Sequence, residues 1–237
     1  MVRTTWLAML MLMWAGSALA QQAPQSPVPA DARAVLRASR PRAIQQVLAS
    51  VKGENPIWRA NAIEAAQHMP ERLLPLVQLA MDDSDPAVRY AALVTVGQLK
   101  IAPLAGVARR LRNDKTRTVQ AAALFALHQL GEEVNLSPLF PMLISDKPGL
   151  RANVAMLLGM IGEVSAVPML VEAAQLPLNR VSPEVSAIVR LQISEAVVTL
   201  LDHSNNTFAR EAREDALMTL RAAVFSQSFE VAVLSVT

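Results

Sequence analysis

The chain has 237 residues, of which 52% are hydrophobic and 18% are charged, with 22 basic and 20 acidic side chains. This composition supplies a large buried core and excludes disorder for most of the chain. The absence of cysteine excludes disulfides, cysteine zinc sites, iron–sulfur clusters, covalently attached haem and a thiol nucleophile. The 8 glycines and the aromatic share of 4% argue against phosphate-binding loops and against stacking platforms for bases.

The first twenty residues have the pattern of a secretory signal peptide. Arg3 provides a positive start, residues 6–15 are apolar, and Ala18-Leu19-Ala20 fits the rule for cleavage before Gln21. The apolar run is shorter than the roughly 20 residues that span a bilayer. We therefore expect an exported protein, periplasmic or secreted, and an uncleaved membrane anchor is the alternative.

Residues 21–30 are rich in proline and glutamine and are expected to form a short extended linker. The remaining residues, 31–237, are expected to form one repeat domain.

A repeat with a period near 31 residues runs through the middle of the chain. The pairs Trp58-Arg59, Val88-Arg89, Val119-Gln120 and Leu150-Arg151 are spaced by 30, 31 and 31 residues. Each pair follows a polar or proline-containing turn and precedes an apolar run. This period is typical of stacked helical hairpins. We predict an all-α fold, an α-solenoid of about five to six stacked antiparallel hairpins.

The repeat around residue 90 predicts the helices in more detail. Asp83-Ser84-Asp85 supplies an N-cap, and Pro86 stands at the first helical position, where its missing N–H is not needed. Apolar residues then occupy most faces of the helix, so it is expected to be sandwiched between others, with Leu93 in the core. Pro103 opens the partner helix, which is expected to end near Arg112.

Residues 76–89 (LVQLAMDDSDPAVR), followed by Ala91-Ala92-Leu93, resemble HEAT repeats, and more closely the short HEAT-like repeats first named in phycobilisome lyases. The resemblance covers about residues 55–175, and Gln120 departs from it where the family has arginine. It implies an armadillo-type superhelix. Because the likeness is at the level of the repeat, it implies no lyase activity.

The two ends of the repeat domain fit the period less well. Residues 31–39 and 41–51 are predicted to form an opening helical hairpin. Two prolines between 175 and 183 mark an insertion of about eight residues. Helices are then expected over 184–201 and 208–224.

The last residues, 228–237, resemble the beginning of another first helix and stop within the pattern. A solenoid normally ends with a polar capping helix. We expect that the chain is truncated here or that its end docks on a partner; a frayed natural terminus is the alternative.

The sequence predicts neither a metal site nor an enzyme. His68, His128 and His203 fall near helix C-termini of different repeats, without metal-ligand spacing. Asp82, Asp83 and Asp85 lack the glycine and the distal glutamate of a calcium loop and suit helix caps. The sequence contains no recognisable nucleophile, phosphate-loop or dinucleotide motif, so we expect no catalytic residue and no cofactor.

The repeated arginines and the acidic turns suggest a structural feature. We expect Arg59, Arg89 and Arg151 to stack near Asp83 and Asp85 as a polar ladder between repeats. Exposed pairs of this kind contribute about 0–1 kcal/mol each, so the ladder is expected to set register more than stability.

The densest basic patch is a candidate interaction patch of Arg109, Arg110, Arg112, Lys115 and Arg117. Nucleic acid is disfavoured because the chain is expected to be exported, is nearly neutral and keeps one tryptophan and one tyrosine after cleavage. Two interpretations stay open. The patch is a solvated turn, or it contacts an acidic protein, an anionic glycan or a lipid headgroup.

Residues 154–171 form an apolar run, but they contain Glu163 and Pro168 and match the repeat in phase. We expect solenoid core here and not a membrane span.

Together these features predict a non-enzymatic scaffold or adaptor that binds an unidentified protein in an extracytoplasmic compartment. The second helices of the hairpins are expected to line its binding surface. The alternatives are a cofactor-handling or lyase-like HEAT protein, discriminated by absorbance above 300 nm, and a structural envelope protein.

Overall fold

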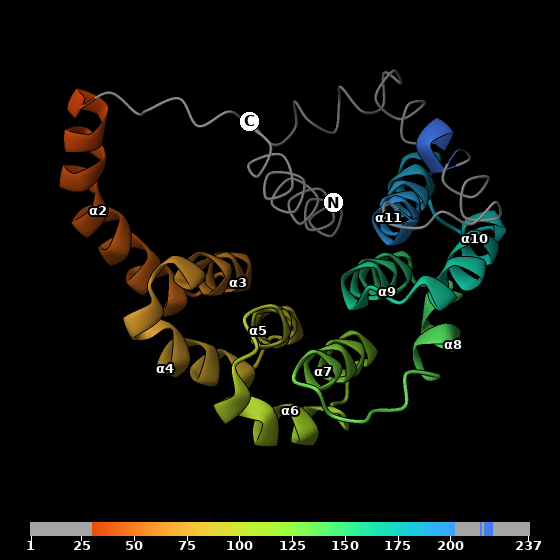
Figure 1. Cartoon of the computed structure of the whole chain (residues 1–237), viewed down its shortest axis with the longest axis horizontal. Helices are drawn as coiled ribbons and strands as arrows, with labels where there is room; N and C mark the ends of the chain where they lie inside the picture. Colours follow the sequence, from red (N-terminus) through yellow and green to blue (C-terminus); the bar gives the residue numbers. More distant parts are fainter. Residues whose placement is uncertain (1–29, 202–213, 215, 220–237) are drawn as a thin grey trace. The chain divides into compact units, whose positions relative to one another are not determined.

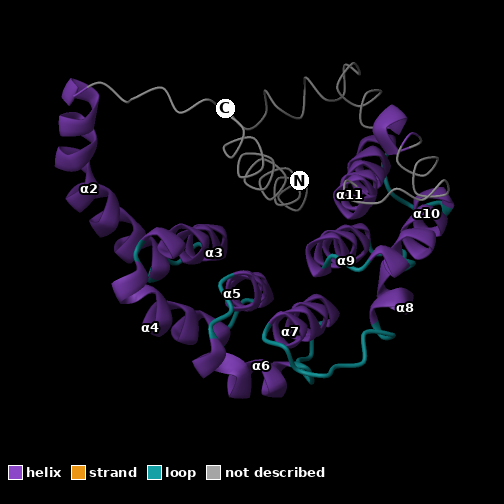
Figure 2. Cartoon of the chain, in the orientation of Figure 1, coloured by secondary structure: helices purple, strands orange, loops and turns teal. Residues whose placement is uncertain are grey.

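The structure is a computed structural model that describes residues 30–201, 214 and 216–219. Within this part the secondary structure is helical and no strand is present (Figure 2). The predicted all-α class is therefore confirmed. The expected signal peptide, nearly all of the linker, His203 and the segment 228–237 lie outside the described residues.

From α5 onwards, longer and shorter helices alternate along the chain (Figure 1). The α-helices are α2 (Ala30–Val51), α3 (Pro56–Ala65), α4 (Pro70–Met81), α5 (Pro86–Gln98), α6 (Ala105–Leu111), α7 (Arg117–Gln129), α8 (Leu139–Leu143), α9 (Pro148–Ile161), α10 (Val167–Gln175) and α11 (Pro183–Leu201). Three 3-10 helices, η1 (Ala66–His68), η2 (Ala102–Leu104) and η3 (Val164–Ala166), lie in the connections. The described residues fall into two compact units, divided between Glu133 and Val134.

In the first unit, α3, α5 and α7 lie side by side in one layer, and α4 and α6 run along the other (Figure 1). Helix α5 packs against α3, α4 and α7, which explains why it is apolar on most faces. All residues from Val88 to Gly97 are buried, and Leu93 is 0% exposed. The placement of Leu93 in the core is confirmed.

In the second unit, α9 packs against α11, while α8 packs on α9 and α10 packs on α11. Helix α9 ends at Ile161 and is capped by Gly162, whose φ of 84° is the left-handed conformation that glycine adopts without strain. The apolar run 154–171 thus spans the end of α9, η3 and the start of α10, as predicted. Residues 176–182 connect α10 to α11 at the expected insertion.

The described helices pair into five hairpins, α2 with α3, α4 with α5, α6 with α7, α8 with α9, and α10 with α11. This pairing differs from the predicted one, in which the helix from Pro86 preceded its partner from Pro103. Both helices exist, but α5 forms its hairpin with α4, which precedes it, while the later helix α6 packs on α7. The reason is the short turn of residues 82–85, which folds α5 back on α4.

The predicted opening hairpin over 31–39 and 41–51 is wrong. These residues form the single helix α2, with Pro41 inside it. Proline removes one N–H donor but has a φ compatible with a helix, and here its ring is exposed to solvent. The helix therefore continues through a residue that sequence reasoning takes as a break.

Two glycines allow neighbouring helices of one layer to approach closely. A Cβ atom on Gly97 of α5 would lie 2.5 Å from a ring carbon of Phe125 and 3.1 Å from the Cα atom of Ala126, both on α7. A Cβ atom on Gly159 of α9 would lie 3.1 Å from the Cα atom of Ala196 on α11. Both contacts are tighter than ordinary packing, so a side chain at either position would force neighbouring atoms to shift.

Candidate interaction surface

Arg59, near the start of α3, connects its own repeat to the next one. Its Nε and Nη2 atoms donate to the two carboxylate oxygens of Asp83, at 2.8 and 2.9 Å. Its Nη1 atom donates backwards to the carbonyl oxygens of Gly53 and Glu54, at 2.9 and 2.8 Å. One guanidinium therefore ties the turn before α3 to the turn before α5.

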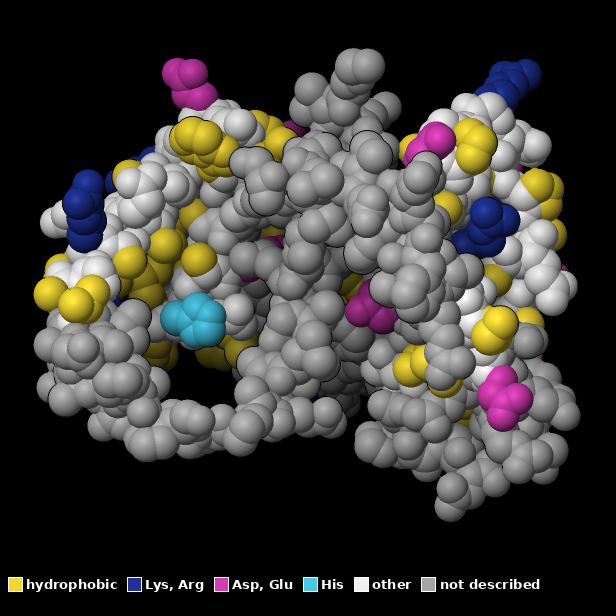
Figure 3. Space-filling model, turned by 90° about the horizontal axis from the view of Figure 1, so that it is seen from above, with side chains coloured by type: hydrophobic (Ala, Val, Ile, Leu, Met, Phe, Trp, Pro, Cys, Tyr) yellow, Lys and Arg dark blue, Asp and Glu magenta, His cyan; other side chains and the backbone are white. Residues whose placement is uncertain are grey.

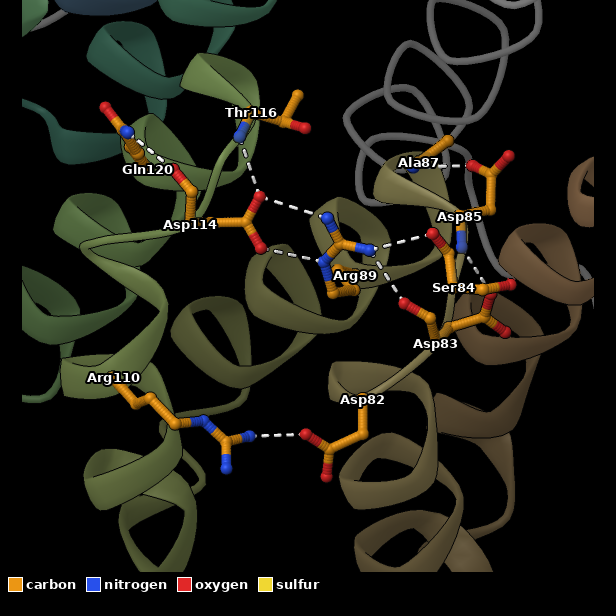
Figure 4. A network of polar contacts seen from close by, with 10 residues as sticks. All are labelled: Asp82, Asp83, Ser84, Asp85, Ala87, Arg89, Arg110, Asp114, Thr116 and Gln120. Atoms are coloured by element: carbon orange, nitrogen blue, oxygen red, sulfur yellow. Dashed lines mark hydrogen bonds and ion pairs between the residues drawn. The ribbon is translucent and has the colours of Figure 1, made fainter.

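Arg89 repeats this arrangement one repeat later (Figure 4). Nε and Nη2 donate to the carboxylate oxygens of Asp114 at 2.9 and 3.0 Å, and Nη1 donates to the carbonyl oxygen of Asp83 at 2.7 Å. Each side chain of this pair is 8% exposed, against 15% for each side chain of the Arg59–Asp83 pair. The Arg89–Asp114 pair is thus the more buried of the two.

The equivalent position near the start of α3, α5, α7 and α9 donates to the carbonyl oxygen six residues before it. Arg59 donates to Gly53 and Arg89 to Asp83, while the amide of Gln120 donates to the Asp114 carbonyl at 2.6 Å and Arg151 donates to the Ser145 carbonyl at 3.0 Å. This contact closes the turn before each helix. Gln120 makes the backward contact, but its shorter side chain lacks the guanidinium that gives Arg59 and Arg89 their forward ion pair.

Arg151 differs from the expected ladder because its forward contacts in the described structure are to backbone carbonyls and not to a carboxylate. Nη1 donates to Leu176 at 2.8 Å and to Ala173 at 3.3 Å. Its side chain is buried, and this burial lowers its pKa despite the nearby charge of Asp146. The end of α10 and the loop after it replace the acidic turn of the earlier repeats, since that loop brings carbonyl oxygens to the arginine.

The two aspartates of the ladder are held as carboxylates. Burial works to raise the pKa of Asp83 and of Asp114, but the hydrogen bonds and charges of Arg59 and Arg89 outweigh it. Backbone N–H groups contribute as well, because Asp85 donates to Asp83 and Thr116 donates to Asp114, both at 2.8 Å. Both pKa values therefore lie below their ordinary range, and the hydrogen bond that Arg59 donates to Asp83 raises the pKa of Arg59.

The other acidic residues of this turn have separate roles. Asp85 accepts a hydrogen bond from the backbone N–H of Ala87 at 2.8 Å and so caps α5. It contributes to the ladder through its charge, which adds to the effect of Asp83 in raising the pKa of Arg59. Asp82 is exposed and pairs with Arg110 (Figure 4).

Neither the acidic turn nor the histidines form a metal site in the part of the chain that the structure describes. No cluster of three or more histidine or acidic side chains suited to a metal occurs there. His68 ends η1, and His128 lies in the last turn of α7.

The structure separates the five cations of the candidate patch into two groups. Arg109 pairs with Glu132 at 2.7 Å, and Arg110 pairs with Asp82, so both carry a carboxylate partner although both are exposed. Arg112, Lys115 and Arg117 are exposed, and no ion pair or side-chain hydrogen bond links them to another described residue. We call these three residues the α6–α7 cations, since they lie between the end of α6 and the start of α7.

The turn that carries the α6–α7 cations is fixed by the contacts of Asp114. Asp114, which lies among them in sequence, is bound to Arg89 and to the backbone N–H of Thr116. Its charge is therefore already paired and neutralises its basic neighbours only weakly. On the face that Figure 3 draws, by contrast, the described basic side chains lie singly among apolar and neutral ones.

Sequence reasoning missed several polar contacts and buried polar groups. Asp114 and Glu132 are ion-pair partners that only the fold brings to their arginines. Burial raises the pKa of Glu64 on α3, and both burial and the charge of Glu64 raise that of Tyr90 on α5. The Tyr90 hydroxyl is buried without a hydrogen-bond partner among the described residues.

A second buried carboxyl lies on α11. Burial raises the pKa of Glu195 to about 7, although the amide of Gln192 donates to it at 3.0 Å, which works in the opposite direction. No sequence motif marks this glutamate, because its neighbours come from the packing of the helix.

Among the described helices, none combines the length and the hydrophobicity that crossing a bilayer requires.

Comparison with known proteins bears on the repeats. A family model described as HEAT repeats matches residues 104–182, and a second, described as HEAT repeat, matches residues 73–100. Curated protein sequences give no match. A solved structure of human deoxyhypusine hydroxylase in complex with glycerol aligns over 91% of this chain and 99% of that chain, with 16% identity and a TM-score of 0.39. That score is too low to indicate a shared fold or function.

The two family matches cover Asp83, Arg89, Asp114 and Arg151, whereas Arg59 on α3 lies before them. The expected resemblance is confirmed at this level: the chain contains HEAT repeats over residues 73–100 and 104–182.

Proposed function

We propose that the protein is a non-enzymatic scaffold that binds an acidic segment of a partner protein in an extracytoplasmic compartment. HEAT repeats commonly serve in protein interactions, and the α6–α7 cations are the observation that carries the more specific proposal. Three exposed positive charges lie within six residues of sequence, and the one carboxylate between them is committed to Arg89.

The geometry suits recognition without rearrangement. The Arg59–Asp83 and Arg89–Asp114 pairs fix the turns on either side of α5, so the cations are presented by a rigid support. Charged groups at the rim of an interface mainly raise the association rate and the specificity. An acidic partner would therefore bind in a salt-dependent manner.

The proposal that the protein is exported rests on its N-terminal sequence. We also propose that the repeats resemble those of phycobilisome lyases more closely than other HEAT repeats. This resemblance implies no lyase activity. N-terminal sequencing of the protein recovered from its host is expected to begin at Gln21. A chain that retains residues 1–20 and stays in the cytoplasm would contradict the location and leave the binding surface to be tested separately.

The binding surface is tested by cross-linking in cells. A tagged chain is compared with the variant Arg112→Gln/Lys115→Gln/Arg117→Gln and with a control, Arg42→Gln/Lys52→Gln/Lys147→Gln, that removes three other exposed cations. We expect one stoichiometric partner with the parent and the control and a reduced yield with the first variant. Equal yields from all three would remove the α6–α7 cations from the account.

A further inference from the structure

The second unit contains a cavity that the scaffold function does not use. Its volume is about 250 Å³, and it lies between α10, α11 and the helical residues 216–219. All of its described lining residues belong to this one unit. The cavity is smaller than the roughly 300–1,000 Å³ of sites for drug-sized molecules, so it suits a small ligand.

The walls of the cavity are mostly apolar. Ile193 and Val197 of α11 are 1% and 2% exposed, and Val171 of α10 and Ala216 complete the apolar lining. Ala174 and Ser194 leave the space open because their side chains are small. Such a surface favours an aliphatic chain, since burying each methylene group contributes about 0.8 kcal/mol.

One cation lies on the same face of α11 as the apolar lining. Arg190 precedes Ile193, Ser194 and Val197 by three, four and seven residues, the spacing that puts residues on one helix face. No ion pair or side-chain hydrogen bond joins Arg190 to another described residue, and no acidic side chain is among the described lining residues. The guanidinium presents two parallel N–H donors that match one carboxylate.

We propose that this cavity binds a small aliphatic carboxylate, with its chain against Ile193 and Val197 and its carboxylate on Arg190. A single positive charge balances a single negative charge, which favours a monocarboxylate over a phosphate ester. The hydroxyl of Ser194, which is 5% exposed, supplies a further hydrogen-bonding group within the cavity.

The proposal is tested by calorimetric titration of the full chain with octanoate and, separately, with octan-1-ol, which has the same chain length and no charge. The variants are Arg190→Gln, which removes the cation, and Ala174→Leu, which fills the cavity. Lys147→Gln, an exposed cation outside the lining residues, is the control for net charge.

We expect the parent and the Lys147→Gln variant to bind octanoate more tightly than octan-1-ol. Arg190→Gln is expected to weaken octanoate binding by about tenfold and to leave the alcohol unchanged. Ala174→Leu is expected to lose both ligands, and circular dichroism checks that it folds. Equal binding of the two ligands, no binding of octanoate, or an unaffected Arg190→Gln variant would each overturn the proposal. Arg190 is exposed, so Arg190→Gln is expected to fold, and this variant keeps the test valid even if Ala174→Leu fails to fold.

Discussion

The side chain of Arg89 on α5 binds both carboxylate oxygens of Asp114, the residue that precedes α7 by three positions, at 2.9 and 3.0 Å. The same guanidinium also holds the carbonyl oxygen of Asp83 in its own repeat, at 2.7 Å. Arg59 holds Asp83 in the same way, so the two arginines connect three successive turns. Register between these repeats is thus specified by charged, nearly buried contacts in addition to apolar packing.

Replacing Arg89 with methionine is expected to destabilise the chain by about 3 kcal/mol. The change keeps an apolar side chain of similar length but leaves the carboxylate of Asp114 nearly buried without its partner, which is more costly than losing an exposed pair. Urea unfolding followed by circular dichroism measures the loss. Arg109→Met, which breaks the exposed pair with Glu132, is the control and should barely change the midpoint. Equal midpoints for both variants would show that the ladder adds no stability.

The lowered pKa values of Asp83 and Asp114 predict a loss of stability in acid. A carboxyl whose pKa is lower in the folded than in the unfolded chain stabilises the fold above the unfolded value, about 3.9, and this contribution is lost as the pH falls through the folded value. Asp114→Asn should therefore lower stability near pH 6 and flatten its decline below about pH 4. Unfolding midpoints measured from neutral to acidic pH test this, with the exposed Glu133→Gln as the control. A decline as steep as in the parent would contradict it.

Glu195 predicts a pH dependence of the opposite sign. Its pKa is raised to about 7 by burial, so its contribution to stability is complete below the unfolded value, about 4.3, and is lost as the pH rises towards 7. Glu195→Gln keeps a neutral group of the same shape at every pH. The variant should gain about 2–3 kcal/mol over the parent at pH 8 and little at pH 4. Thermal unfolding at the two pH values measures this, and Glu172→Gln, exposed in the same unit, should show no such difference.

Gly97 and Gly106 are both helical but predict opposite effects of an alanine substitution. A Cβ atom at position 97 would lie 2.5 Å from the Phe125 ring and 3.1 Å from the backbone of α7, whereas nothing lies within 4 Å of one at position 106. Gly97→Ala should therefore cost about 1–3 kcal/mol through overpacking, despite the better helix propensity of alanine. Gly106→Ala should stabilise the chain by about 0.5–1 kcal/mol. Chemical denaturation of both variants tests the pair, and a stabilising Gly97→Ala would contradict the close approach of α5 and α7.

The repeat period and the helix starts were predictable because they rest on local signals. Pro86, capped by Asp85, begins α5 as expected, since proline and aspartate favour these positions whatever the tertiary fold. The helix with which each helix pairs was harder to predict, because the same hydrophobic period fits a hairpin with the preceding or with the following helix. Pro41 shows a further limit, since an exposed proline inside a helix has the same sequence signal as a break.

The ladder could be predicted only in part. The repeated arginines marked one side of each contact, but Asp114 follows Arg89 by 25 residues and is separated from it by a whole helix. Arg151 occupies the expected position and binds carbonyl oxygens instead, because the loop after α10 takes the place of an acidic turn. The patch from Arg109 to Arg117 was visible as a run of charge, but only the fold shows that Arg109 and Arg110 are already paired.

The central claim is tested most directly by the affinity of the purified chain for the partner recovered by cross-linking. Biolayer interferometry at low and at physiological ionic strength would compare the parent, the variant lacking Arg112, Lys115 and Arg117, and the control lacking Arg42, Lys52 and Lys147. The account predicts that the first variant binds about tenfold more weakly and loses most of the salt dependence, while the control matches the parent. Equal affinities and equal salt dependence for the three proteins would contradict it.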